Sequence, residues 1–139
     1  MEVTFYKPEN YEQLMELYKK GEQFLLHDIT DSAQSLARKI KRDPESIILV
    51  WQDQMLAGTI SFMEDGRMAL LLRIMIDPVL NAKDVLVKKL FDTAEGILKK
   101  RGYEEIHSIA RLDHMQSDVW RAQNGFARSR DYSWYFKKV

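Results

Sequence analysis

A long amphipathic helix between two strand-forming runs most limits what this chain can fold into. Residues 83–101 carry apolar side chains at helical spacing, and lysines lie on the opposite face. Strand-forming runs lie on both sides, at residues 68–76 and 103–110. Two strands joined through one helix by short connections predict a parallel crossover. We therefore expect an α/β protein in which these two runs are neighbours in one sheet.

Short turns place two further strands before the crossover. The runs at residues 47–51 and 55–62 are separated by a turn at residues 52–54. A second tight turn, with Asp-Gly at its centre, spans residues 64–67 and leads into the run at 68–76. Connections this short predict an antiparallel meander of three strands.

The remaining segments alternate between helical and strand patterns. A strand is expected at residues 3–6, and helical stripes are expected at residues 11–18 and 33–40, the latter capped by Asp31 or Ser32. A short helix is expected at residues 118–124. Aromatic side chains alternate along residues 131–139, which predicts a last strand. One domain over residues 1–139 is the simplest interpretation.

Composition excludes several classes of site. The chain has no cysteine, so disulfides and thiolate metal sites are excluded, and its three histidines are isolated, so no metal site is expected. Twenty-one basic and 21 acidic residues balance, which gives no general attraction to nucleic acid. No membrane segment and no signal peptide are recognised, so we expect a cytoplasmic protein with neither nucleic acid nor membrane as partner.

The order of elements also carries a family resemblance. Leu56-Ala57-Gly58 follows the first turn, Leu72-Arg73-Ile74-Met75-Ile76-Asp77-Pro78 ends the third strand, and Asn124-Gly125-Phe126 ends the short helix. In this order, these stretches resemble the GNAT superfamily of acyl-CoA-dependent N-acetyltransferases. The resemblance implies a mixed central sheet of about six or seven strands flanked by about four helices. It also implies transfer of an acetyl group from acetyl-CoA to an unidentified amine on a small molecule or a protein.

The resemblance assigns candidate cofactor-binding residues. In this family the central strand splays from its neighbour, and the acetyl-pantetheine arm bonds to its backbone, here at Ile74, Met75 and Ile76. The pyrophosphate rests on backbone amides at the start of the next helix, where the helix dipole favours an anion. The positions that would face it are Asn81, Ala82, Lys83, Asp84, Val85 and Leu86. His114 lies where an asparagine of the family contacts the CoA arm.

The pyrophosphate loop departs from the family pattern. Asp84 and Leu86 stand in place of two glycines, and Asn81 stands in place of a Gln or Arg. A carboxylate about 5 Å from a phosphate charge repels it by roughly 3 kcal/mol at an effective dielectric near 20. Lys83, Lys88 and Lys89 offset part of that repulsion. Two interpretations stay open: Asn81 and Asp84 cap the helix themselves in a capping box, or a variant loop still holds CoA.

The catalytic positions also differ from the family pattern. Arg121 stands where many members have the tyrosine that protonates the leaving thiolate. Arginine is a poor proton donor, so Arg121 either stabilises thiolate charge or is an exposed charge on a helix. The central strand offers Arg73 as its one charged residue. His27 or Asp28, before the second helix, is the candidate general base, and the alternative is that both are ordinary loop residues.

Two further functions therefore stand beside the enzyme. One is a catalytically degraded GNAT-fold protein that binds a ligand or another protein. The other is a purely structural or homodimeric module that uses the aromatic last strand, with Tyr132, Trp134 and Phe136 on one face.

Overall fold

The computed structural model describes residues 1–21, 29–110 and 115–139. It divides into two compact units, Met1–Ile109 and Ala110–Val139, which are described one at a time. The expected single domain over residues 1–139 therefore stays a prediction. No helix among the described residues is long and apolar enough to cross a membrane.

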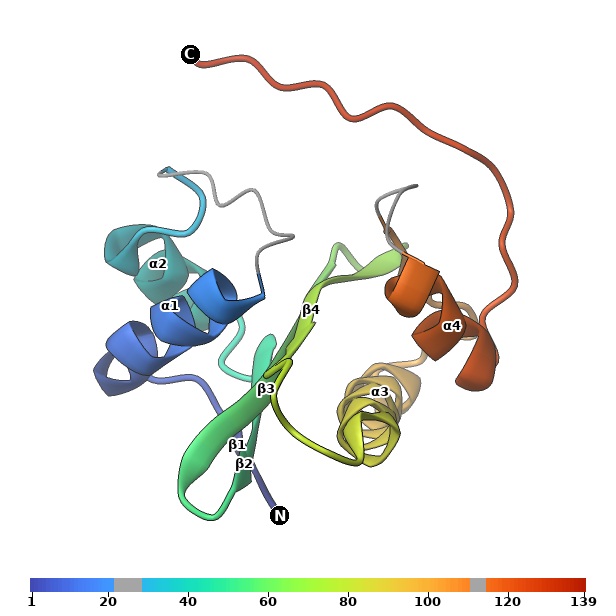
Figure 1. Cartoon of the computed structure of the whole chain (residues 1–139). Coiled ribbons are helices and arrows are strands. Elements are labelled where there is room, and N and C mark those ends of the chain that lie inside the picture. Colours follow the sequence, from blue (N-terminus) through green and yellow to red (C-terminus); the bar gives the residue numbers. More distant parts are fainter. Residues whose placement is uncertain (22–28, 111–114) are drawn as a thin grey trace. The chain divides into compact units, whose positions relative to one another are not determined.

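The first unit is built on a five-stranded mixed sheet (Figure 1). Its strands, in sheet order, are β1 (Glu2–Phe5), β2 (Ile47–Gln52), β3 (Met55–Glu64), β4 (Ala69–Ile76) and β5 (His107–Ser108). The first four pair antiparallel, and β5 pairs parallel to β4. The predicted meander and the predicted parallel crossover are both confirmed.

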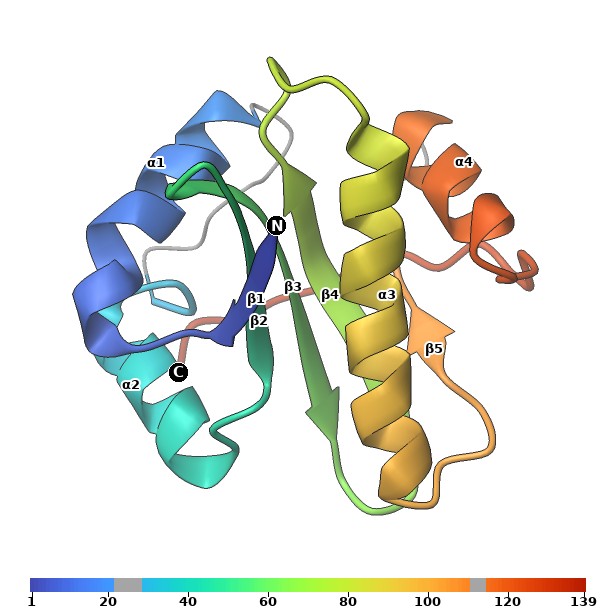
Figure 2. The same cartoon turned by 90° about the horizontal axis from the view of Figure 1, so that it is seen from below.

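Helices cover both faces of this sheet (Figure 2). The short 3-10 helix η1 (Pro8–Asn10), α1 (Tyr11–Lys20) and α2 (Ala33–Arg42) lie on one side, and α3 (Lys83–Lys100) lies on the other. The Ser32 hydroxyl accepts a hydrogen bond from Ser35 N at 3.2 Å, which confirms one of the two predicted caps of α2. Leu14, Leu36 and Met75 belong to one buried cluster, so α1, α2 and β4 share a core.

The β3–β4 pair leaves no room for a side chain at Gly58. Gly58 pairs with Ile76, and a Cβ added to Gly58 would lie 2.9 Å from the Met75 carbonyl oxygen. The same Cβ would lie 2.5 Å from Ile76 Cδ1. Glycine at this position therefore permits the close backbone approach that aligns the end of β4.

The second unit contains α4 (Met115–Gln123) followed by an extended segment. The predicted short helix is confirmed, but the predicted strand at residues 131–139 is wrong, because none of these residues pairs in a sheet. Alternation of side chains makes a strand only when a second backbone supplies hydrogen bonds. Tyr132 and Trp134 are instead 76% and 69% exposed.

The sheet has fewer strands than the six or seven expected, because the last predicted strand is absent among the described residues. The strand predicted at residues 103–110 forms, but it shortens to His107–Ser108. The Tyr103 amide donates instead to the Leu98 carbonyl of α3 at 3.2 Å, which extends the turn after the helix.

Candidate active site

The edge of β4 that faces β5 is largely unpaired. The parallel ladder joins Leu70 to His107 and Leu71 to Ser108, and the described residues extend it no further. On its other edge β4 pairs with β3 as far as Ile76. Within the part of the chain that the structure describes, the backbone of residues 72–76 therefore has a strand neighbour on one side only, which is the requirement for an added extended ligand.

This open edge contains the three residues predicted to contact the CoA arm. The side chains of Ile74, Met75 and Ile76 are all buried in the first unit. What they offer a ligand is therefore backbone N–H and C=O rather than side-chain chemistry. That agrees with the predicted mode of contact, which needs only the backbone.

A bulge interrupts β4 where the open edge begins. Ser61 pairs with Leu72 and Thr59 with Met75, so Ile60 alone opposes two residues of β4. One of these is Arg73, whose φ of 55° lies in the left-handed region. A bulge bends its strand and re-aims the residues beside it. A non-glycine residue in this conformation costs of the order of 1 kcal/mol or more, and such strain clusters at functional sites.

Buried Asp77 organises the connection from β4 to α3. Its amide donates to the Ala57 carbonyl at 2.8 Å, and its carboxylate accepts from Val79 N at 3.1 Å. The other carboxylate oxygen pairs with Lys20 Nζ at 3.0 Å, at the end of α1. These bonds fix the chain direction as it leaves the sheet toward the helix start.

The start of α3 carries no side-chain cap. The N-cap residue is Ala82, with φ 56° and ψ 38°, and no side chain hydrogen-bonds to the helix start. The predicted capping box of Asn81 and Asp84 is therefore wrong, because the cap position falls one residue later than predicted, on a left-handed alanine. The first amides of α3, those of Lys83 and Asp84, have no acceptor one turn earlier in the helix.

Side chains around this helix start are mostly directed to solvent. Asn81, Ala82, Asp84 and Val85 are exposed, whereas Leu86 is buried in the core face of α3. The leucine in place of the second family glycine therefore does not obstruct the amides. An anion approaching the helix start meets exposed backbone and the charges of the first turn.

Those charges are mixed in sign. Asp84 is an acidic residue in the first turn, where it interacts favourably with the helix dipole but repels an incoming anion. Lys88 pairs with Asp92 at 2.8 Å, so part of its charge is already balanced. Lys83 and Lys89 take part in no ion pair among the described residues, and Lys83 is next to the open amides.

A half-buried ion pair crosses from β4 to the segment before α2. Arg73 Nε donates to Asp31 Oδ1 at 3.1 Å, and Arg73 Nη2 donates to Asp31 Oδ2 at 2.9 Å. The Thr30 hydroxyl donates to the same carboxylate at 2.8 Å. Burial raises the pKa of Tyr18, and the Asp31 carboxylate raises it further, so the phenol stays neutral. Sequence reasoning named both charged residues but could not pair them, because they are 42 positions apart.

Of the predicted catalytic residues, the structure describes one. His27 and Asp28 lie outside the described residues, and so does His114. Arg121 lies on α4 in the second unit, where its guanidinium donates to the Ser117 carbonyl at 3.1 Å and to the Ser117 hydroxyl. Burial lowers the pKa of Arg121 to about 10. The alternative of an exposed helix charge is therefore wrong, and a role in stabilising thiolate charge stays a prediction.

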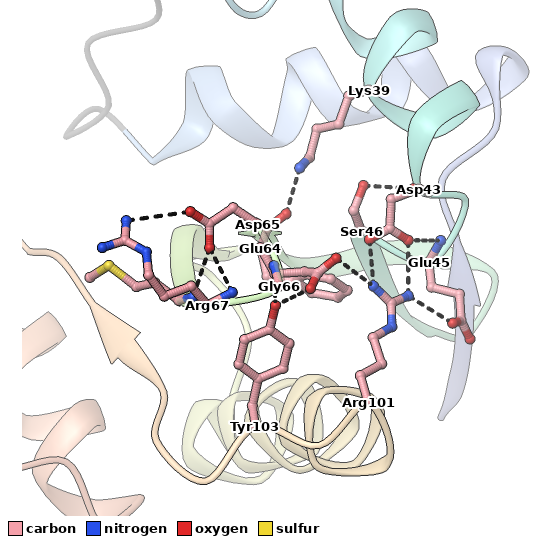
Figure 3. A network of polar contacts seen from close by, with 12 residues as sticks. Lys39, Asp43, Glu45, Ser46, Glu64, Asp65, Gly66, Arg67, Arg101 and Tyr103 are labelled. Carbon is pink, nitrogen blue, oxygen red and sulfur yellow. Dashed lines mark hydrogen bonds and ion pairs between the residues drawn. The ribbon is translucent and has the colours of Figure 1, made fainter.

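The C-terminal end of α3 is held by a network of hydrogen bonds and ion pairs (Figure 3). Arg101 donates to Asp43 at 2.7 and 3.0 Å and to Glu45 at 3.0 Å, and it lies 3.7 Å from Glu64. The Tyr103 hydroxyl donates to Glu64 and accepts from Gly66 N. The hydrogen bonds to Arg101 hold the pKa of Asp43 below its usual range.

A cavity of about 280 Å³ lies beside this network, lined by residues of the β3–β4 turn and of the segment before β5. Its lining includes Arg67, Tyr103, Glu105 and His107. Within the described residues, no group of acidic, histidine or cysteine side chains is arranged to hold a metal ion.

Comparison with known proteins finds solved structures of the same fold, but no family model and no curated protein that match the sequence. Among solved structures, it is similar to the PaiA N-acetyltransferase of Thermoplasma acidophilum in complex with coenzyme A, with TM-score 0.79 and 22% identity over 91% of this chain and 89% of that one.

Two further solved structures agree. The aminoglycoside N-acetyltransferase AAC(6')-Iy, in complex with the bisubstrate analogue CoA-S-monomethyl-acetylneamine, gives TM-score 0.76 and 15% identity over 99% of this chain and 98% of that one. Ard1 from Thermoplasma volcanium gives TM-score 0.73 and 14% identity over 93% and 84%. The chain resembles the GNAT N-acetyltransferases and has their fold.

Proposed function

We propose that this protein transfers an acetyl group from acetyl-CoA to an amine. The observation that carries the proposal is the combination of an uncapped start of α3 with an unpaired edge of β4 in one unit. Helix amides favour a pyrophosphate, and an open strand edge favours an extended amide-containing arm. The solved structures with this fold that contain CoA or its analogue support the same assignment.

In the proposed reaction the amine nitrogen attacks the thioester carbonyl carbon. The new C–N bond forms, the C–S bond breaks, and CoA leaves as a thiolate that takes up a proton. The proton lost by the amine passes to a general base, for which His27 and Asp28 are the candidates from the sequence. Backbone N–H groups of β4 near the bulge would polarise the carbonyl oxygen.

Each candidate residue has a distinct part in this proposal. Ile74, Met75 and Ile76 would hold the arm by their backbone, and the segment 81–85 would hold the pyrophosphate. Lys83 would add positive charge beside the phosphates. His27, Asp28 and His114 remain candidates from the sequence alone, as base for the first two and as a contact to the arm for the last.

The proposal is tested by following release of the CoA thiol. Purified protein is incubated with acetyl-CoA and a panel of amines, and thiol is measured with a chromogenic disulfide. We expect release that depends on both the protein and one class of amine. Release no faster than spontaneous hydrolysis with every amine would contradict transferase activity.

A second candidate function is a GNAT-fold protein that binds CoA or a partner without catalysis. It is favoured by Asp84 in the first turn of α3 and by Arg121 where the family often has a tyrosine. Acetyl-CoA binding without thiol release from any amine would support this candidate. Isothermal titration calorimetry with acetyl-CoA separates such a ligand-binding protein from one that binds no CoA.

A further inference from the structure

The Asp31–Arg73 ion pair lies on the face of the sheet that α3 does not cover. Asp31 comes directly before the Ser32 cap of α2, and α2 packs with α1 on one face (Figure 2). Met75, two residues after Arg73 on β4, packs into that same cluster. Arg73 therefore stands at the open edge of β4 and is directed toward the α1–α2 side.

The geometry of the pair fixes the guanidinium firmly. Both nitrogen contacts go to different oxygens of one carboxylate, at 3.1 and 2.9 Å, which is the bidentate arrangement. The Asp31 side chain is 7% exposed and that of Arg73 is 25% exposed. Asp31 is thus almost completely enclosed, while about a quarter of the Arg73 side chain is accessible. The bonds to Asp31 come from Nε and Nη2, and the third guanidinium nitrogen, Nη1, takes no part in them.

The bulge gives the pair its place relative to the proposed chemistry. Arg73 itself has the left-handed φ of 55°, at the first residues of β4 that β5 leaves unpaired. Under the proposed function, the CoA arm occupies that edge and its phosphates lie at the start of α3. The acceptor then approaches from the α1–α2 side, past Arg73.

A fixed cation at this position selects among acceptors. Asp31 balances most of its net charge, so the preference is directional: the planar guanidinium donates to a second carboxylate through Nη1, which takes no part in the bonds to Asp31. The Asp31 oxygens are themselves engaged by Arg73 and Thr30. The group offered toward the acceptor side is therefore the arginine N–H donor.

Resting on the proposed function, we infer that Arg73, held in place by Asp31, binds a carboxylate of the acceptor. The acceptor class is then small amines that also carry a carboxylate, that is, free amino acids. Arg73 determines specificity, and Asp31 is a positioning residue that acts through it.

The test compares each amino acid with its own carboxamide, which keeps the amine and removes the negative charge. kcat/KM is measured from thiol release with acetyl-CoA. We expect the wild type to prefer the acids at least tenfold, and Arg73→Gln to reduce that preference below twofold. Arg73→Lys, which keeps a charge but loses the bidentate contact, should retain part of it.

Two further variants serve as controls, one for misfolding and one for the loss of any arginine charge. Arg73→Gln leaves the Asp31 carboxylate enclosed without its cation, so the double variant Asp31→Asn/Arg73→Gln removes both charges together. It should fold and also show no preference. Arg67→Gln is the matched control, because that arginine is 84% exposed on the β3–β4 turn and should keep the full preference.

Binding of the products separates this inference from the proposed function. N-acetyl amino acids and their carboxamides are titrated into wild type and Arg73→Gln by calorimetry, without CoA. Heat with the acids that disappears in Arg73→Gln supports the inference even where acetyl-CoA fails to bind. Two results would overturn the inference and leave the proposed function standing, provided that acetyl-CoA binds. One is an equal kcat/KM for acids and amides, and the other is an equal heat of binding for both products.

Discussion

The two ends of α3 differ in whether their polar groups are hydrogen-bonded within the protein. At the C-terminal end, Arg101 bonds Asp43 and Glu45 and lies beside Glu64 (Figure 3). Its guanidinium carbon lies over the Phe62 ring, 5.3 Å from the ring centroid. At the N-terminal end the helix starts at a left-handed alanine with no side-chain cap.

The difference shows how one fold divides stability from binding. Polar groups that are bonded within the protein add to the free energy of unfolding, whereas amides left open at a helix start are available to a ligand. The closed end should therefore respond to substitution in stability and not in ligand affinity. The open end should respond in the reverse way.

Removing the charge at the closed end should produce the largest effect. Arg101→Met keeps an unbranched side chain but removes the guanidinium from Asp43 and from the face of the Phe62 ring. We expect the free energy of unfolding to fall by about 2–3 kcal/mol, because hydrogen bonds to charged groups are lost in a partly buried setting. Chemical denaturation measures this loss. Arg67→Met, at an 84% exposed arginine, should change stability by less than about 0.5 kcal/mol. Equal losses in both variants would show that the network adds no stability.

Disturbing the alignment of β3 with β4 should cost somewhat less. Gly58→Ala places a Cβ 2.9 Å from the Met75 carbonyl oxygen, so backbone has to move. We expect a loss of about 1–3 kcal/mol, as for other overpacked sites. The matched control is Gly96→Ala, where an added Cβ meets nothing within 4 Å on α3. Alanine there should stabilise by about 0.5–1 kcal/mol, so opposite signs are expected from the same substitution.

The closed end should also weaken in acid. Hydrogen bonds to Arg101 lower the pKa of Asp43 in the folded state. A depressed folded pKa gives stability that is present above the unfolded value, near 4, and is lost as pH falls through the folded value. The stability difference between wild type and Arg101→Met should therefore shrink as pH is lowered from 6 to 3. A difference that stays constant over this range would contradict the role of the Asp43 contact.

At the open end, a smaller effect is expected in affinity alone. Asp84→Asn removes a negative charge from the first turn of α3 without changing its size. At about 5 Å in a solvent-exposed setting, that charge repels one phosphate charge by roughly 0.8 kcal/mol, which is about fourfold in Kd for acetyl-CoA. Glu95→Gln, about 16 Å farther along the same helix, should have no effect beyond the Debye length. Equal affinities of Asp84→Asn and wild type would refute the electrostatic argument at Asp84.

Much of the fold was predictable because its signals are local. The helical spacing of Val87, Leu90, Phe91 and Ala94 identified α3, and all four are buried as that spacing requires. Short connections then determined the antiparallel order of β2, β3 and β4. The parallel place of β5 followed from the crossover.

The site was less predictable because its features depend on distant contacts. The bulge at Arg73 arises from the register between β3 and β4, which no local pattern of Leu72, Arg73 and Ile74 reveals. The pairing of Arg73 with Asp31 spans 42 residues. The predicted cap at Asn81 was wrong because alanine rarely adopts the left-handed conformation that Ala82 has here.

The central claim is that the start of α3 receives the pyrophosphate of acetyl-CoA. Lys83→Glu and Lys100→Glu make the same charge change at the two ends of this helix, and isothermal titration with acetyl-CoA compares both with wild type. The account predicts binding to wild type, a loss of the order of tenfold in Lys83→Glu and unchanged affinity in Lys100→Glu. No heat with wild type at millimolar acetyl-CoA, or equal weakening in both variants, would contradict it.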